Sequence, residues 1–358
     1  MNKLISLLLV CMMVFCSVSA FAMTEVDASS DRGITPKGML EGGTFALNPV
    51  IEGESPTTGE PWTGEYIPVL VNIDNIKQAR PQWGIGKADI VYEMPIDRLG
   101  YTRLMALFSN EYPAAAGPVR SARIMHADMR EEWDAAWVFC GGQEASGSNV
   151  FTRIRQLGVY DKAVNLAFNL QGSNGSAFNS SRDGRKSPHH HQLKMDELVS
   201  YLAQTGYDFP ERPFLFTDDA VTGDDASYVE MDFGSGHSNS YYVFDAEKNA
   251  YLRYIKEDNV PYVDETAPSQ TLDYENIIVQ WTALKYYEGT GNRPNLTEVG
   301  QGNADFFMNG KHVEGYWVRS DIDQRTVFFD SEGNEIKLQR GRSWIILASD
   351  KFLDVLYE

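Results

Sequence analysis

The chain has 358 residues, with 50 acidic and 31 basic side chains and a net charge of −19 at pH 7. This excess of negative charge disfavours bulk binding to nucleic acid and adsorption to anionic lipid. Charged residues make up 23% and aromatic residues 12% of the chain. That composition is typical of a globular protein and excludes a disordered one.

The N-terminus has the pattern of a secretory signal peptide over residues 1–22. Lys3 supplies the basic end, residues 4–15 the apolar core, and Ala20-Phe21-Ala22 a small-x-small cleavage site. The apolar run is short for a membrane span, which favours cleavage after Ala22 over retention as an N-terminal anchor. We therefore expect an exported protein, extracellular or associated with the cell envelope, with no transmembrane segment in its mature chain.

The three cysteines bear on lipidation and on disulfide formation. A lipid-modified cysteine normally follows a small residue, whereas Cys11 follows Val10 and Cys16 follows Phe15. The sequence therefore disfavours a lipid anchor. The mature chain keeps only Cys140, so an internal disulfide is excluded and a packed core must stabilise the fold.

The chain after the signal begins with residues 23–62, which are rich in Gly, Pro, Thr and acids and predict a flexible tether. Residues 63–212 then mix strand and helix patterns, which predicts an α+β or α/β part. In chain order, we expect buried strands at 67–74, 88–94 and 102–109, a helix at 122–133, a strand ending in a Gly pair at 136–142, a helix around 146–156, a polar loop at 169–190 and a helix at 192–206.

Residues 213–358 form a second, β-rich part. Residues 239–255 have a hairpin pattern, and residues 276–287 form a strong strand pattern. Asn309-Gly310 is the strongest short hairpin signal in the chain. A further hairpin is expected around residues 331–334.

The acidic charge is unevenly distributed along the chain. Residues 112–195 contain ten basic and seven acidic side chains, so a cationic window lies inside an acidic protein. Such a window suits an anion-binding site. Its arginines can equally pair with carboxylates of the acidic remainder.

The stretch GPVRSAR, residues 117–123, places two arginines at the start of the expected helix, where acidic side chains are preferred. A helical wheel separates a basic sector from an apolar one: Arg120, Arg123, His126 and Arg130 on the first, and Met125, Met129 and Trp133 on the second. A helix N-terminus with arginines commonly holds a carboxylate or phosphate. The counter-ion is either an external ligand or a protein carboxylate such as Glu93 or Asp97.

Two further stretches carry polar or glycine residues of interest. SSRDGRKSPHHHQ, residues 180–192, predicts a loop that caps the sheet with Arg182 and His189 pointing inward. Three consecutive histidines cannot all face one ion, so we expect neither a metal site nor a cofactor. In FCGGQEASGS, residues 139–148, the glycine pair either offers backbone donors to an anion or forms a tight turn. A Ser or Cys nucleophile has little support there.

These motifs together resemble a known family. QARPQWGIGKADIVYEMPIDRLGYTRLMALF, GPVRSAR, FCGG and RDGRKSPH occur in that order, followed by NIIVQW, GQGNADFFMNGKHVEGYWVRSD and GRSWI. The chain is similar to the YerB-like family of exported bacterial proteins, a two-part family of unknown function whose members are often lipoproteins. The resemblance implies an α+β fold with a layered β/β/α sandwich in the N-terminal part and a mostly β C-terminal part.

The resemblance also implies a set of recurrent polar positions, which form a cleft if the fold brings them together. They are Glu93, Arg103, Arg120, Arg123, Asp128, Gly141, Gly142, Arg182, Asp183 and His189. It implies no activity, and the catalytic residues stay unassigned.

We expect first a non-catalytic module that binds an anionic cell-envelope component or a peptide carboxylate through Arg120, Arg123 and Arg182, with backbone donors from Gly141 and Gly142. An alternative is a cell-envelope hydrolase with His189 as shuttle and Asp128, Asp183 or Glu93 as acid or base. A third is a scaffold that docks a protein partner through exposed aromatics of the β-rich part, namely Tyr241, Tyr242, Tyr286 and Tyr287.

Overall fold

The computed structural model describes residues 23–234, 237–286 and 293–358, so the predicted signal peptide lies outside it. The fold is α+β in class and mostly β. Its α-helices are α1 (Ile124–Trp133), α2 (Val150–Gln156) and α3 (Met195–Thr205), and all of them belong to the N-terminal part. Within the described residues, none of the helices has the length and apolar character needed to cross a membrane. The β/β/α layering stays a prediction.

A large mixed sheet of 11 strands runs through both parts of the chain. Its N-terminal strands are β2 (Val69–Asp74), β3 (Ile90–Pro95), β4 (Thr102–Phe108), β6 (Ala136–Phe139) and β9 (Ala167–Asn169). Its C-terminal strands are β13 (Asp224–Asp225), β19 (Asn276–Trp281), β22 (Gly300–Met308), β23 (Lys311–Arg319), β24 (Val327–Asp330) and β26 (Ser343–Ala348). The order is β13-β23-β22-β19-β26-β3-β4-β2-β6-β9, with β24 paired to β23.

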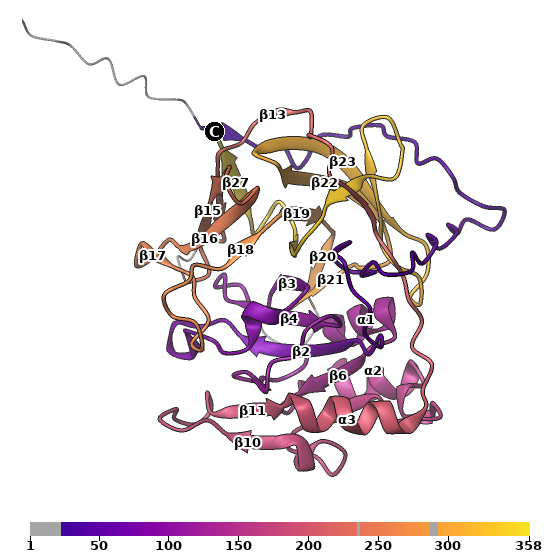
Figure 1. Ribbon diagram of the computed structural model, residues 1–358, viewed down its shortest axis with the longest axis vertical. Coiled ribbons are helices and arrows are strands. Elements are labelled where there is room, and N and C mark those ends of the chain that lie inside the picture. Colours follow the sequence, from indigo (N-terminus) through magenta and orange to yellow (C-terminus); the bar gives the residue numbers. More distant parts are fainter. Residues whose placement is uncertain (1–22, 235–236, 287–292) are drawn as a thin grey trace, which may run out of the picture.

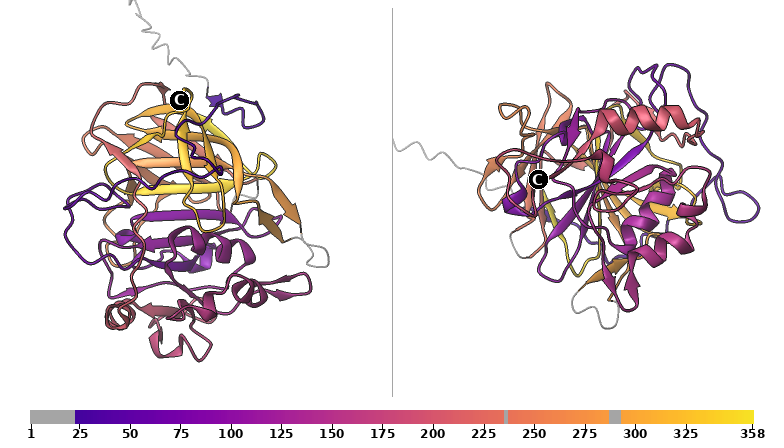
Figure 2. Two further views of the ribbon diagram at one scale, coloured as in Figure 1. Left: turned by 90° about the vertical axis from the view of Figure 1, so that its right-hand side faces the viewer. Right: turned by 90° about the horizontal axis from the view of Figure 1, so that it is seen from below.

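The two parts meet inside this sheet. Strand β26 pairs in parallel with β3, from Ser343 opposite Ile90 to Ile346 opposite Glu93. All residues of both strands are buried, as expected for parallel strands covered on both faces. The parts lie one above the other along the long axis of the molecule (Figures 1 and 2), and their cores are continuous.

A second sheet, of seven strands, belongs mainly to the C-terminal part. It contains β1 (Thr24–Glu25), β27 (Asp354–Tyr357), β14 (Tyr228–Asp232), β15 (Ser240–Asp245), β16 (Ala250–Ile255), β17 (Val260–Pro261) and β18 (Asp273–Tyr274). The expected hairpin of residues 239–255 is β15 with β16, and Asn309-Gly310 connects β22 to β23. Both are confirmed.

The remaining elements are short. They are the strand sets β5 (Ala115–Ala116), β10 (Asn179–Ser181) and β11 (His191–Lys194); β12 (Leu215–Thr217) and β25 (Lys337–Gln339); β20 (Leu284–Tyr286) and β21 (Pro294–Leu296); β7 (Glu144–Ala145) and β8 (Ser148–Asn149). Four 3₁₀ turns are η1 (Lys77–Ala79), η2 (Ile85–Lys87), η3 (Val159–Asp161) and η4 (Ser176–Phe178). The expected polar loop at 169–190 thus contains η4 and β10.

The burial of residues in helix α1 agrees with the helical wheel for the apolar side and disagrees with it for the basic side. Its apolar residues Met125, Met129 and Trp133 are buried as predicted. The predicted basic face is wrong, because Arg120 precedes the helix and both His126 and Arg130 are fully buried. Arg130 pairs with acidic neighbours at the C-terminal end of α1 and not with an anion at its start.

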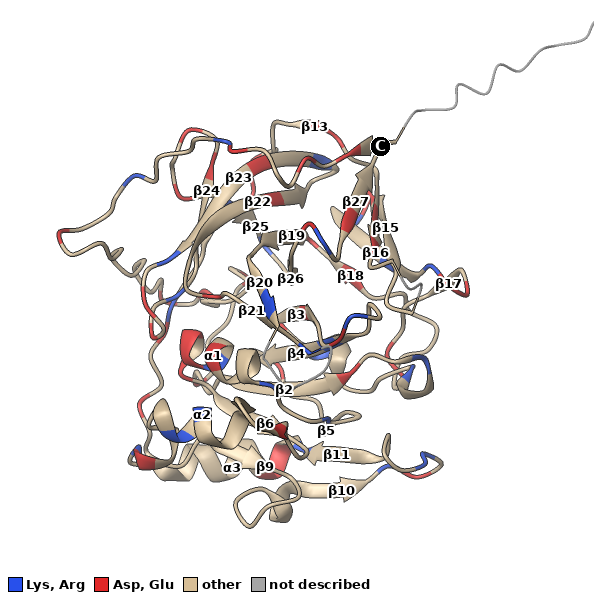
Figure 3. Ribbon diagram, turned by 180° about the vertical axis from the view of Figure 1, so that it is seen from behind, with Lys and Arg blue, Asp and Glu red and all other residues tan. Residues whose placement is uncertain are grey.

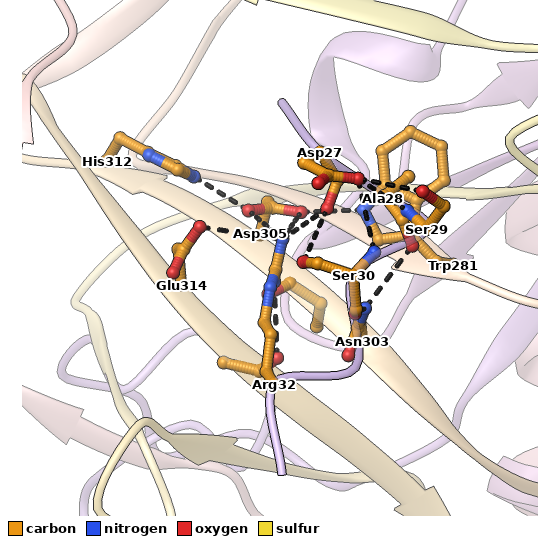
Figure 4. Close-up of polar contacts among 12 residues, drawn as sticks. Asp27, Ala28, Ser29, Ser30, Arg32, Trp281, Asn303, Asp305, His312 and Glu314 are labelled. Carbon is orange, nitrogen blue, oxygen red and sulfur yellow. Dashed lines mark hydrogen bonds and ion pairs between the residues drawn. The ribbon is translucent and has the colours of Figure 1, made fainter. Parts of the chain in front are cut away.

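Part of the segment expected as a tether, residues 23–62, makes specific contacts with the C-terminal part. Strand β1 pairs with β27. Farther on, Arg32 reaches the fully buried Asp305, and its Nη2 donates to both carboxylate oxygens at 3.1 Å. The same carboxylate accepts from Trp281 Nε1 at 2.6 Å and lies 2.7 Å from His312 Nε2 (Figure 4). These contacts fix the start of the segment on the protein surface.

Candidate functional site

The GPVRSAR stretch lies between two other segments and is bonded to both. The backbone N–H of Arg120 donates to the carbonyl of Asn72 on β2 at 2.9 Å, and the Arg120 carbonyl accepts from Cys140 at 3.1 Å. Two residues later, the N–H of Ala122 donates to the carbonyl of Gly141 at 3.0 Å. The segment is therefore held in an extended conformation up to the start of α1, which fixes where its arginines lie.

Asp74 is the carboxylate on which these side chains converge. It ends β2, is fully buried, and lies opposite Arg103 on β4. Its Oδ2 is 3.0 Å from Arg120 Nε and 2.9 Å from His189 Nδ1, while its Oδ1 is 3.8 Å from Arg103 Nη2. Residues from β2, β4, the GPVRSAR stretch and the 180–192 loop thus meet at one carboxylate.

Asp74 carries one negative charge, so it cannot neutralise Arg103 and Arg120 together, and Arg123 adds a further positive charge. Arg103 Nη1 donates to the Ser121 carbonyl at 3.3 Å and Arg123 Nη1 to the Ala122 carbonyl at 3.1 Å. No carboxylate of the described residues lies within ion-pair distance of Arg123. Burial, followed by the like charge of Arg103, lowers the pKa of Arg123. The site therefore carries uncompensated positive charge.

His126, in the first turn of α1, holds the start of the helix in place. Its Nδ1 accepts from the backbone N–H of Arg123 at 3.1 Å and from Asn72 Nδ2 at 2.9 Å, and Asn72 Oδ1 accepts from Trp137 Nε1 at 2.8 Å. Burial, with the nearby Arg103 and Arg123, holds the pKa of His126 well below its usual value, so the ring is neutral. Nε2 then carries the proton, and it is buried with no partner among the described residues.

We call the six residues Asp74, Arg103, Arg120, Arg123, His126 and His189 the arginine cluster. Asp74, Arg103 and His126 are buried, whereas the side chains of Arg120 and His189 are 26% and 15% exposed. The cluster therefore reaches solvent at Arg120 and His189. Acidic residues occur on both parts of the surrounding ribbon (Figure 3), so the cluster is a cationic site in an acidic protein.

The glycine pair forms a tight turn, the second of the two roles expected for it. The N–H of Gly141 donates to Asn169 Oδ1 at 2.9 Å, so the prediction that it is a free donor for an anion is wrong. Gly141 has a φ of +72°, which favours glycine. A Cβ on Gly142 would lie 2.5 Å from Val150 Cγ1. The pair thus forms the tight turn that places the Arg120 segment beside β6.

Glu93 belongs to a different polar cluster, so it is not the counter-ion of the arginines. It is fully buried, its Oε2 accepts from Trp344 Nε1 at 2.9 Å, and the same oxygen is 3.5 Å from Arg253 Nη2. Its Oε1 accepts from Thr102 Oγ1 at 2.6 Å and Asn75 Nδ2 at 3.0 Å. This buried ion pair joins the N-terminal and C-terminal parts.

Three other predicted site residues lie outside the arginine cluster. Asp128, on α1, accepts at its Oδ1 from Arg153 Nε on α2 at 2.6 Å. Arg182 pairs with Glu265 of the C-terminal part at 2.8 Å. Asp183 is exposed and has no side-chain hydrogen bond or ion pair within the described part of the chain. Asp97, the other expected counter-ion, accepts instead from the backbone of residues 99 and 101.

The structure also shows the surroundings of the candidate thiol nucleophile and of the tyrosines expected to dock a partner. Burial raises the pKa of the Cys140 thiol to about 11, which disfavours a nucleophilic thiolate. Among the tyrosines of the proposed scaffold surface, Tyr242 is buried, Tyr241 stacks between Tyr228 and Tyr254, and Tyr286 lies under the Arg98 guanidinium at 3.9 Å. Tyr287 lies outside the described residues.

Comparisons with known proteins bear on the family and the fold. The model described as "Protein of unknown function (DUF3048) N-terminal domain" matches residues 57–208, and the corresponding C-terminal domain matches residues 229–345. "Putative lipoprotein YerB" of Bacillus subtilis (strain 168) is 27% identical over 303 residues, which cover 83% of this chain and 86% of that protein. "Uncharacterized protein YusG" of the same organism is 36% identical over 58 residues, or 15% of this chain and 74% of that protein.

A solved structure agrees with the fold. The crystal structure of the YerB protein from Bacillus subtilis matches with a TM-score of 0.69 at 24% identity, and the match covers 84% of this chain and 99% of that one. The two family models together span most of the chain, including every residue of the arginine cluster. The chain therefore belongs to the YerB-like family of two-part proteins of unknown function, as its motifs indicated.

Proposed function

We propose that the protein is a non-catalytic binding module that holds an anionic group in the arginine cluster. The observation that carries this proposal is the charge of the cluster: Arg103 and Arg120 share one buried carboxylate, Asp74, and Arg123 has only the Ala122 carbonyl as a side-chain partner. Unpaired buried charge is costly, and the Nε atoms of Arg103 and Arg123 have no hydrogen-bond partner among the described residues. A bound anion would supply the missing partner.

The place of action is the cell envelope or the extracellular space. This is supported by the signal-peptide pattern of residues 1–22 and by the printed name of the YerB relative, which calls it a lipoprotein. The preferred ligands are therefore an anionic envelope component or the carboxylate of a peptide. The poor sequence context of Cys11 and Cys16 favours a mature protein without a lipid anchor.

Ligand-induced stabilisation tests this function. A ligand present at 100 times its dissociation constant should stabilise the fold by about 2.7 kcal/mol. We would measure thermal unfolding with peptidoglycan fragments and anionic wall polymers at constant ionic strength. Arg120→Ala and Arg123→Ala should abolish the shift. Arg155→Ala removes the same charge from an exposed position on α2 and should keep it. Equal shifts in all three variants would refute the proposal.

A second candidate function, hydrolysis, is favoured by one specific contact. His189 Nδ1 lies 2.9 Å from Asp74 Oδ2, the arrangement in which a carboxylate orients a histidine that acts as general base. The carboxylates expected for this role, Glu93, Asp128 and Asp183, have other partners or none in the described chain. Release of products from purified peptidoglycan by the wild type, lost in His189→Gln, would establish hydrolysis; equal release by both would exclude this dyad.

A further inference from the structure

The arginine cluster has a charge and a distribution of donors that distinguish between classes of anion. Resting on the function proposed above, we propose that it binds a phosphoryl group carrying two negative charges in preference to a single carboxylate. The balance of charge and the directions from which the donors come decide which anion binds.

The charge balance leaves two positive charges. Arg103, Arg120 and Arg123 bring three, and Asp74 removes one through its contacts with Arg120 and Arg103. Of the other charges near Arg123, Arg293 repels it more than Asp97 attracts it, so these two do not remove the positive excess. A monocarboxylate would leave one buried positive charge unmatched, whereas a phosphoryl dianion would match both.

The donors come from three different elements. Arg103 belongs to β4, Arg120 and Arg123 to the GPVRSAR segment, and His126 to the first turn of α1. Arg103 reaches both Asp74 and the Ser121 carbonyl, so its guanidinium lies between β2 and the segment that carries the other two arginines. A planar carboxylate accepts from donors in one plane through two oxygens. A tetrahedral group presents three oxygens in different directions and suits donors that approach from several sides.

The start of α1 adds to the preference for an anion with high charge. Its first turn contains no acidic side chain, and Arg123 is the residue at its N-terminal boundary. The helix therefore presents the positive end of its dipole together with the guanidiniums. His126 Nε2, fully buried and without a hydrogen-bond partner in the part of the chain that is described, is a neutral N–H donor at the same end. Arg120 and His189, both partly exposed, provide the route from solvent.

Three aromatic probes separate charge from shape: phenyl phosphate, phenyl sulfate and benzoate. The first is a tetrahedral dianion above about pH 6, the second a tetrahedral monoanion and the third a planar monoanion. Isothermal titration of the full mature chain at pH 8 and constant ionic strength should give phenyl phosphate an affinity at least about tenfold above benzoate, the factor that one further charge-assisted hydrogen bond contributes. At pH 5 that advantage should shrink, because phenyl phosphate takes up a proton.

Phenyl sulfate keeps one charge at both pH values, so any change in its binding reports a change in the protein and not in the probe. Arg123→Gln should lower the affinity for phenyl phosphate more than Arg155→Gln, the matched change at an exposed position. Arg123→Lys keeps the charge and removes the guanidinium, and this variant should also bind phenyl phosphate less well than the wild type. If benzoate binds as tightly as phenyl phosphate, the phosphoryl preference is wrong and anion binding stands. If none of the probes binds, or Arg155→Gln loses as much as Arg123→Gln, anion binding at this site is itself refuted.

Discussion

Asp74→Asn is the change that most directly tests the charge balance of the arginine cluster. The amide has nearly the same shape as the carboxylate, so packing at the end of β2 is preserved while the negative charge is lost. Asp74 is the carboxylate within 4 Å of both Arg120 and Arg103. The variant leaves three guanidiniums close together without a counter-charge, so we expect it to unfold more easily than the wild type.

The size of the effect follows from burial. Removing one partner of a buried ion pair costs about 3–5 kcal/mol. Arg120 and His189 are partly exposed, and water can solvate them in the variant, so the lower end of that range applies. For a protein of this size about 3 kcal/mol corresponds to a fall in the melting temperature of about 4 °C. The amide oxygen still accepts a hydrogen bond, which keeps the loss from exceeding this estimate.

Urea unfolding followed by tryptophan fluorescence measures the free energy, and Asp183→Asn provides the matched control. Asp183 is exposed and makes no ion pair in the described chain, so that variant should differ from the wild type by less than about 0.5 kcal/mol. Added sulfate should stabilise Asp74→Asn more than the wild type, because the variant has one more unmatched positive charge. If Asp74→Asn is as stable as Asp183→Asn and responds equally to sulfate, the charge balance given above is wrong.

Three further predictions concern buried groups elsewhere. Glu93→Gln should lower the free energy of unfolding in urea by about 3 kcal/mol, because Arg253 stays buried without its counter-ion; a loss below about 1 kcal/mol would contradict this. Burial, with a smaller effect of Asp128, raises the pKa of Glu298 well above its usual value. The folded protein then keeps a proton that the unfolded chain releases, so wild-type stability falls as pH rises above about 4.3, by up to about 1.4 kcal/mol per pH unit. Glu298→Gln should reduce this slope, the remainder coming from Asp89 and Glu275, whose pKa values burial also raises, and should be the more stable protein at pH 8; urea midpoints of variant and wild type that change equally between pH 5 and pH 8 would refute it. Arg32→Met should cost about 2 kcal/mol, because Asp305 loses the hydrogen bonds of its arginine and keeps those of Trp281 and His312, and it should speed cleavage of residues 23–62 by thermolysin; unchanged cleavage would show that other contacts hold the segment.

The local elements of the fold were predictable because their signals are local. Alternating and continuous apolar runs identified β2, β3 and β4, and Asn309-Gly310 identified the turn between β22 and β23. The joining of β26 to β3 was not predictable, because two apolar strands about 250 residues apart in sequence carry no mark of their pairing. The start of residues 23–62 was misjudged for the same reason: its composition is that of a linker, and Asp305, which holds Arg32, is remote in sequence.

The candidate site was predictable only in part. Arg120 and Arg123 stood out by an unusual charge at a helix start, and the structure brings Arg103 and His189 to the carboxylate that Arg120 contacts. Asp74 was missed, although a carboxylate at the end of a buried strand in which Asn72 is the other polar residue is a usable signal, since such a group must find a partner when buried. The helical wheel misplaced Arg120 because α1 begins only after Arg123, and periodicity cannot locate the first residue of a helix to better than a turn.

The arginine cluster and the junction between the two parts are connected through consecutive residues. Asp74 contacts Arg120 and His189, and the next residue, Asn75, donates to Glu93 Oε1 at 3.0 Å. Glu93 in turn accepts from Trp344 Nε1 on β26 of the C-terminal part. Residues that share one hydrogen-bond network couple by about 0.5–3 kcal/mol. The shortest route from the cluster to the C-terminal part therefore runs through the peptide unit between Asp74 and Asn75, and any coupling along it would have to be reciprocal.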